Sequence, residues 1–169
     1  DIDGKSIHVA QLERAKLGWR LLQYGSVPLP PDTVKLAFKS PNIVDVARFQ
    51  EAITDALGYL VHEAPVIGLS LPNEVVKTTL HRFKELPGTK AEIEKMIVWT
   101  ARKTHVFPEE DVDVSYHLAG QIPDGDSVLI ATSGVRDVLN GYERAFQEMG
   151  ISPAVIRPTS INQLNLFIQ

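Results

Sequence analysis

The sequence predicts a mixed α/β fold, because segments with the two-residue period of a strand alternate with segments that have the period of a helix. The clearest strand covers residues 112–122, where apolar and polar residues alternate from Val112 to Leu118. The clearest helix start is Thr89-Lys90-Ala91-Glu92, a capping box whose threonine and glutamate side chains satisfy backbone donors of the first turn. With 169 residues, 44% of them hydrophobic, the chain can form one core or two small subdomains.

The first part of the chain is predicted to begin with an antiparallel meander. Residues 1–2, 7–12 and 17–27 are its expected strands, with a tight Asp-Gly turn after the first. Asp45 is expected to cap a helix that reaches Leu60, and residues 65–71 form a buried strand. The order of elements in this part is therefore β-β-β-α-β.

The middle of the chain is predicted to be a strand, a helix and a further strand. The strand begins at Val76, and the helix that follows Thr89 ends at Phe107-Pro108, because proline cannot donate a backbone hydrogen bond. A turn at residues 123–126 then leads into residues 127–132, which are apolar on both faces and so are expected to form an inner strand.

The last part is predicted to contain two helices with a short strand between them. Ser133 is expected to cap the first helix and Gly150 to end it. Residues 154–157 form the strand, and Thr159 or Ser160 caps the final helix. The sequence begins without methionine and stops inside this last helical pattern, so we expect it to be a piece of a longer protein. Its final apolar residues would then be partly uncovered, which favours self-association.

Composition excludes several classes of function. The formal net charge is −4, the pI is about 5.7, and acids and bases are interleaved, so we expect no nucleic-acid partner. The chain has no cysteine, which fits a reducing compartment, and no apolar run approaches the ~20 residues of a membrane helix. We therefore expect a soluble cytoplasmic protein. The five histidines lack metal-ligand spacing, and we predict no metal site.

Four features together resemble the PilM family of type IV pilus assembly proteins. They are the acid-Gly-Ser turn between the first strands, the apolar strand ending in Leu71-Pro72, the Trp99 helix running into residues 107–110, and the run of residues 128–158. This family belongs to the actin-like group that contains the cell-division protein FtsA, and the cytoplasmic domain of the secretion protein GspL is a relative. The resemblance covers essentially the whole chain and corresponds to about the first half of a full-length member.

The resemblance implies an actin-like (ribonuclease H-like) subdomain, residues 1–74 and 151–169, with a small α/β subdomain inserted at residues 75–150. It also implies a non-catalytic cytoplasmic scaffold, peripheral to the inner membrane, that serves type IV pilus or type II secretion assembly. Its implied partners are the cytoplasmic tail of the membrane protein PilN, other pilus platform proteins and a second copy of itself. We expect the PilN peptide to bind where the inserted module meets the core. Within the module, the open edge of its sheet is the first candidate site.

The alternative function is an actin-like ATPase or a sugar-kinase relative. In actin-like proteins the first turn binds phosphate, and here Asp1, Gly4, Lys5 and Ser6 are the candidate cofactor-binding residues. Asp3 stands where the family pattern has glycine, and its charge would point into an anion site. A hairpin turn without any ligand is an equally good interpretation. The resemblance implies that ATP and magnesium bind, if at all, in the full-length protein and not in this fragment. No catalytic residue is predicted, since no serine nucleophile motif is present.

Trp99 is the candidate partner-binding residue. On a helical wheel it falls among charged residues, whereas the core stripe centres on Ile93, Ile97 and Thr100. Such a tryptophan either anchors a partner or packs under a neighbouring loop of the same chain.

Overall fold

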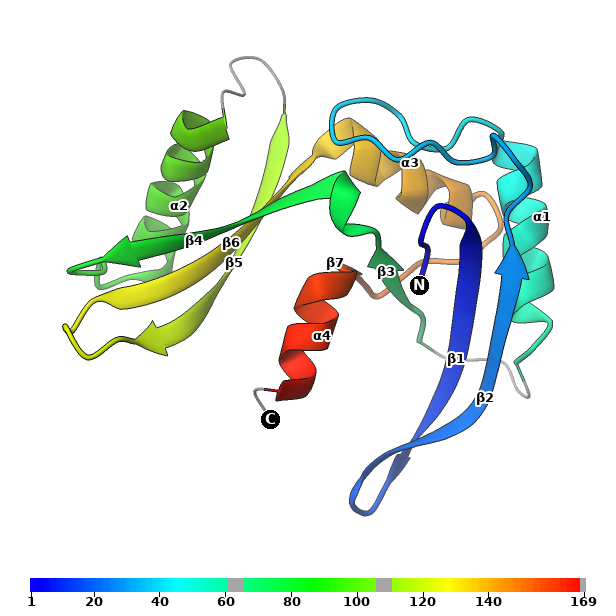
Figure 1. Cartoon of the computed structure of the whole chain (residues 1–169), viewed down its shortest axis with the longest axis horizontal. Coiled ribbons are helices and arrows are strands. Elements are labelled where there is room, and N and C mark those ends of the chain that lie inside the picture. The colour runs from blue at the N-terminus through cyan, green and yellow to red at the C-terminus, as the bar shows by residue number, and fades with distance from the viewer. Residues whose placement is uncertain (61–65, 106–110, 168–169) are drawn as a thin grey trace. The chain divides into compact units, whose positions relative to one another are not determined.

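The computed structural model describes residues 1–60, 66–105 and 111–167, and they form a mixed α/β fold, as predicted (Figure 1). The contacts divide the chain into two compact units. The first unit contains Asp1–Val75 and Val138–Gln169, and the second contains Val76–Asp137. The second unit is thus one continuous segment inserted into the first along the chain.

The first unit contains an antiparallel hairpin and a parallel strand pair. The hairpin joins β1 (Ser6–Ala15) to β2 (Gly18–Pro28), and the parallel pair joins β3 (Gly68–Leu71) to β7 (Val155–Pro158). Its helices are α1 (Val46–Leu57), the 3-10 turn η1 (Asn73–Val75), α3 (Arg136–Gln147), which enters the unit at Val138, and α4 (Thr159–Phe167).

The predicted start of α1 is confirmed, but the predicted three-stranded meander is not. The Asp45 carboxylate accepts a hydrogen bond from the Arg48 backbone N–H at 3.0 Å, which caps α1. Residues 1–2 form no strand of their own. Ile2 makes a single bridge to Ile7, and its N–H donates to the Ser70 carbonyl at 3.0 Å. The start of the chain is therefore hydrogen-bonded to both β1 and β3.

Two aromatic side chains of α3 pack against α1 in the core of the first unit. The Phe49 ring meets Tyr142 and Phe146 edge-on, with ring centroids 6.2 and 6.4 Å apart, and all three side chains are buried. We predicted that this helix would belong to the inserted subdomain, which would then reach residue 150. Its apolar side instead packs against α1 in the first unit, because burial of apolar side chains against another apolar surface is favourable.

The predicted cap of α3 is wrong. Ser133 lies inside β6 (Ser127–Val135), and its hydroxyl is buried with no hydrogen-bond partner among the described residues. The strand continues to Val135, and α3 follows at Arg136 without a break. Pairing with strands on both sides continues the extended backbone past the serine, and this outweighs the local capping preference.

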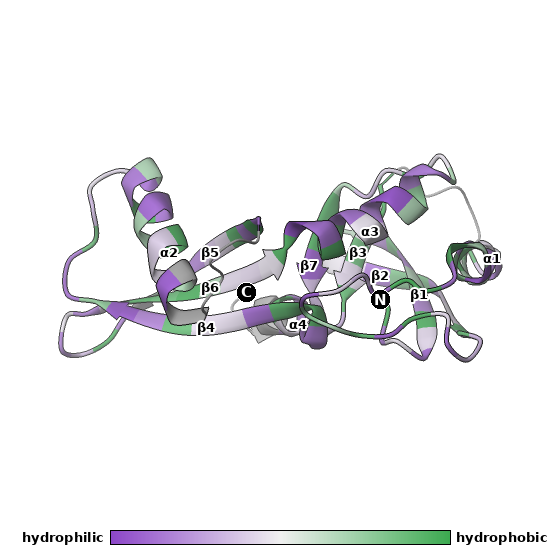
Figure 2. Ribbon diagram, turned by 90° about the horizontal axis from the view of Figure 1, so that it is seen from above, coloured by the Kyte–Doolittle hydropathy of each residue, from purple (hydrophilic) through white to green (hydrophobic). Residues whose placement is uncertain are grey.

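The second unit is a three-stranded antiparallel sheet with one helix. Its strand order is β4 (Val76–Phe83), β6, β5 (Val112–Gln121), so the predicted inner strand is confirmed. Helix α2 (Lys90–His105) packs on the sheet, and the buried side chains at this contact are Ile97, Leu129 and Ala131. Both hydrophobic and hydrophilic residues are seen along α2 in Figure 2.

The predicted start of α2 at Thr89 is confirmed, but only the threonine half of the capping box is seen. The Glu92 N–H donates to the Thr89 hydroxyl at 3.3 Å. The Glu92 carboxylate accepts a hydrogen bond from that hydroxyl, at 2.7 Å, instead of binding the backbone N–H of Thr89. The predicted end of this helix at Phe107-Pro108 lies outside the described residues.

Tyr142 provides a test of the core between α1 and α3. Its hydroxyl is buried with no hydrogen-bond partner in the described part of the chain, and burial raises the pKa of its phenol. We expect Tyr142→Phe to leave the free energy of unfolding unchanged or raise it by up to about 1 kcal/mol, because an unsatisfied polar group is removed without a cavity. Tyr142→Ala should cost ~3–5 kcal/mol, because it removes the ring. Urea unfolding of the two variants checks this, and a clear loss of stability in Tyr142→Phe would contradict it.

His81 on β4 makes the stability of the second unit depend on pH. Its Nε2 atom lies 2.8 Å from the Thr79 hydroxyl, and burial lowers its pKa below the ordinary 6.5. The unfolded chain therefore takes up the proton first. The contribution of neutral His81 to the free energy of unfolding is present in full above the ordinary pKa and is lost as the pH decreases below it. We expect His81→Gln to reduce this loss, while His117→Gln, at an exposed position on β5, should not. Thermal melting between about pH 7 and 5 checks this, and equal curves for both variants would contradict it.

Candidate functional site

The turn of residues 1–6 carries four of the predicted site residues, and two of its backbone N–H groups bind the carboxylate of its own Asp3. The Asp3 carboxylate accepts hydrogen bonds from the backbone N–H groups of Lys5, at 2.9 Å, and Ser6, at 2.7 Å. The Asp3 N–H in turn donates to the Ser6 carbonyl at 3.2 Å. Gly4 has a φ of 84°, and a Cβ there would lie 2.9 Å from the Leu36 side chain, so this position requires glycine.

The same hydrogen bonds determine the chemistry of this turn. Backbone N–H groups that converge on one point form the usual anion site of such a turn, and here two of them already bind a carboxylate. His8 lies on the other side of this carboxylate, with its Nε2 atom 3.2 Å from Asp3 Oδ2. Partial burial acts to raise the pKa of Asp3, but hydrogen bonds from Lys5, His8 and Ser6 outweigh it, and the net pKa is lowered. Asp3 therefore takes the place of an external anion.

Asp1 links the beginning of the chain to the start of α4. The Thr159 hydroxyl lies 3.0 Å from the Asp1 carboxylate, 3.0 Å from the Leu71 carbonyl and 3.1 Å from the Ser70 hydroxyl. The Asn73 side chain accepts a hydrogen bond from the Ser160 N–H at 3.0 Å. Sequence reasoning identified Thr159 only as a helix cap. Asn73 also caps the start of α4, although it lies in another segment of the chain, and no local sequence pattern predicts this contact.

Trp99 is exposed on the surface of α2. Its side chain is 62% exposed, and the Lys103 ammonium lies 5.0 Å from the centre of its ring, at cation–π distance. Ala91, Glu94, Lys95 and Val98 line a shallow hollow beside it. Of the two interpretations of this residue, packing under a loop of the same chain does not occur among the described residues. The ring is available to a partner.

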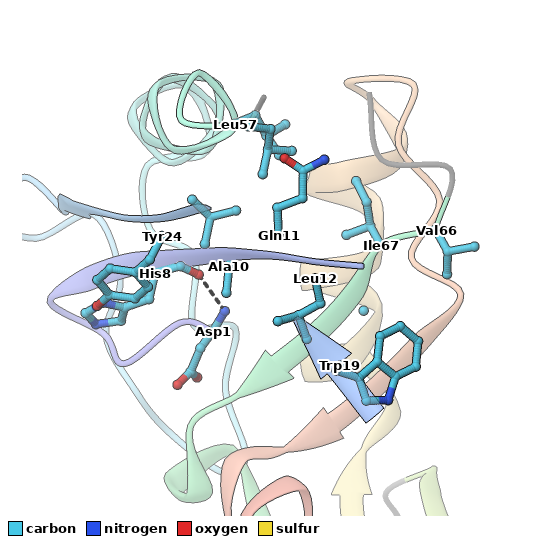
Figure 3. A pocket seen from close by; sticks show the side chains of 13 residues that line it. Asp1, His8, Ala10, Gln11, Leu12, Trp19, Tyr24, Leu57, Val66 and Ile67 are labelled. Carbon is cyan, nitrogen blue, oxygen red and sulfur yellow. Dashed lines mark hydrogen bonds between the residues drawn. The ribbon is translucent and has the colours of Figure 1, made fainter. Parts of the chain in front are cut away.

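A hollow of about 920 Å³ lies within the first unit, beside β1 (Figure 3). Its walls come from β1 and β2, from residues 66–68, which lead into β3, and from Leu57 and Leu60. Figure 3 shows Asp1, His8 and Tyr24 on one side of it and Leu12 and Trp19 on another. The Asp1 amino group donates to the His8 carbonyl at 2.8 Å, which is the dashed line in the figure. The hollow is mainly apolar and holds no catalytic grouping among its lining residues.

The two edges of the second unit's sheet differ in regularity. The pairing of β4 with β6 is unbroken from Val76 to Phe83. The pairing of β5 is interrupted between Leu118 and Gly120, where the register shifts. Irregular edges resist the addition of a further strand, whereas a regular edge accepts one. The edge formed by β4 is therefore the more suitable for an extended peptide.

No group of three or more metal-ligating side chains is present in the described ranges. Within those ranges, no helix is both long enough and apolar enough to cross a membrane.

The chain is similar to known proteins at the level of structure. No family model matches the sequence, and no curated protein sequence matches it. The fold is similar to a chain of a solved structure described as a PilM-PilN type IV pilus biogenesis complex. The TM-score is 0.79 at 15% sequence identity, and the match covers 94% of this chain and 46% of the other. The chain therefore has a PilM-like fold and spans about half the length of the solved chain.

Proposed function

We propose that this chain is part of a non-catalytic scaffold that binds the cytoplasmic tail of a PilN-like membrane protein. The observation that carries the proposal is the similarity of fold to a chain of a PilM-PilN complex over 94% of this chain. In this proposal the scaffold is cytoplasmic, peripheral to the inner membrane, and serves type IV pilus assembly or the related type II secretion. Other platform proteins and a second copy of the scaffold are further proposed partners.

The first unit, in this proposal, is an actin-like subdomain, and the second is its insertion. A hairpin followed by a parallel strand pair supports this arrangement. So does the path of the chain, which leaves the first unit after Val75 and returns to it at Val138.

The outer edge of β4 is the proposed binding site for the peptide. An extended peptide binds a sheet edge through main-chain hydrogen bonds, while its alternate side chains contact the side chains of the edge strand. Leu80, in the middle of β4, is 70% exposed and offers an apolar contact at this edge. Leu80 pairs with Ile130 of β6, and the register of this pairing is continuous to both ends of β4. A short apolar peptide would therefore find both backbone groups and an apolar contact.

We expect Leu80→Lys to weaken binding of a synthetic PilN amino-terminal peptide by about tenfold, because it places a charge at the apolar contact. The matched control is Leu118→Lys on β5, whose parent leucine is also exposed, at 52%. Both substitutions lie on the surface, so neither should alter the fold. Amide chemical-shift mapping with the peptide should show the largest shifts along β4.

Two results would contradict the β4 site. One is equal weakening of peptide binding by both variants. The other is a set of shifts confined to the turn of Asp1 to Ser6, which would favour the enzyme alternative. Absence of any shift at millimolar peptide would overturn the peptide-binding function itself.

The self-closed turn supports the non-catalytic part of the proposal. A phosphate would have to displace the Asp3 carboxylate from the N–H groups of Lys5 and Ser6. It would also approach a carboxylate whose pKa is lowered, which is therefore charged at neutral pH. Both the lost hydrogen bonds and the like charge disfavour nucleotide at this position.

We expect this chain to show no micromolar binding of magnesium ATP, because the donors of its first turn are occupied. Isothermal titration calorimetry checks this, with Asp3→Gly as the comparison that frees the two N–H groups. The PilN-peptide affinity should be the same in both proteins, because the turn and β4 belong to different units. Micromolar ATP binding by the unmodified chain would contradict the prediction and favour an actin-like ATPase.

A further inference from the structure

The end of the β1–β2 hairpin is an exposed apolar projection of the first unit. Every residue from 12 to 21 is exposed. Four large apolar side chains are among them: Leu12 at 55%, Leu17 at 101%, Trp19 at 67% and Leu21 at 58%. Leu17 lies in the turn between the strands and is fully exposed to solvent. Exposed apolar groups of this density on one element indicate a surface that binds something.

The strand register separates the apolar and charged residues of this hairpin end. Leu12 pairs with Leu21 and Arg14 with Trp19, so these four side chains lie on one face. Glu13 pairs with Arg20 on the opposite face, where they form an ion pair. Glu13 is the one acid in residues 12–21. Once it is matched to Arg20, the charges of Arg14 and Lys16 remain beside the apolar side chains.

This end of the hairpin is positive although the whole chain is negative. Residues 12–21 contain three cations and one acid, in a chain whose formal net charge is −4. A positive projection on a negative body is drawn to an anionic surface, and the body is held away from it.

We propose that the end of the β1–β2 hairpin, residues 12–21, docks on an anionic lipid bilayer. Leu17 and Trp19 would enter the interface, where tryptophan is favoured because its ring is apolar and its N–H is polar. Arg14 and Lys16 would lie at the level of the lipid phosphates. A protein partner is the weaker alternative, since a stable interface covers about 800 Å² on each side and four side chains at a hairpin end offer much less. The inference rests on the hairpin alone and not on the proposed function.

The two tryptophans of the chain allow the docking to be observed at each of them separately. Trp99→Phe leaves Trp19 as the single fluorophore, and Trp19→Phe leaves Trp99. Vesicles of phosphatidylglycerol and phosphatidylcholine should shift the Trp19 emission to shorter wavelength, and brominated lipid should quench it. The Trp99 emission should not change. Because both tryptophans are exposed, neither substitution should alter the thermal melting curve, which provides the folding control.

Vesicle sedimentation separates the apolar contribution from the charge contribution. We expect Leu17→Ser with Trp19→Ser, and separately Arg14→Glu with Lys16→Glu, each to reduce binding by about tenfold or more. Leu118→Ser, at an exposed leucine of β5 in the other unit, should bind like the unmodified chain. Binding should also weaken as salt is added, because it depends on screened charges.

Three results with lipid vesicles would overturn the proposal. They are an unshifted Trp19 emission on anionic vesicles, equal binding to purely zwitterionic vesicles, and equal responses of Trp19 and Trp99. A Trp19 shift that follows protein concentration without lipid, together with a dimer in light scattering, would also overturn it and assign the surface to self-association. None of these measurements includes the PilN peptide, so their failure leaves the proposed function untouched, and failure of peptide binding leaves this inference untouched.

Discussion

The parallel pairing of β3 with β7 is the interaction on which the first unit depends. It joins residues 68–71 to residues 155–158 in a continuous register, across the whole inserted segment. The first residues of the chain attach to the same pair, through the bond from the Ile2 N–H to the Ser70 carbonyl. Thr159 attaches α4 to it through the Leu71 carbonyl. Because parallel strands need a long connection, the second unit can be inserted between them while the pair still closes.

The insertion explains how the two units form separate cores. The aromatic contact of α1 with α3 buries Phe49 and Tyr142 in the first unit, and the contact of α2 with β6 buries Ile97 and Leu129 in the second. The chain passes directly from β6 into α3, so one continuous segment supplies the central strand of one unit and a core helix of the other. A substitution in one core should therefore act mainly on its own unit, because hydrophobic contacts are short-ranged.

The exposed surfaces of the two units differ in a way that suits the two proposed partners. On β4, the exposed Leu80 lies in a regular strand edge, which offers backbone hydrogen bonds to an extended peptide. At the end of the β1–β2 hairpin, the apolar groups stand beside cations and Leu17 lies in a turn, so the contact there depends on side chains and charge. The turn of Asp1 to Ser6 does not offer the backbone N–H groups of Lys5 and Ser6 to a ligand, since they already donate to the Asp3 carboxylate.

The sequence by itself determined those features that depend on neighbouring residues. The Asp45 cap, the Thr89 cap, the Asp3-Gly4 turn and the inner position of β6 all follow from local patterns, and the structure contains each of them. Tertiary structure alone decided the rest. Ser133 was expected to begin a helix and lies in a strand, because two neighbouring strands pair with it. The partner of α3, the bridge at Ile2 and the occupied donors at Asp3 likewise depend on contacts or side-chain geometry that no sequence spacing encodes, since hydrogen bonds and packing act on distance in space.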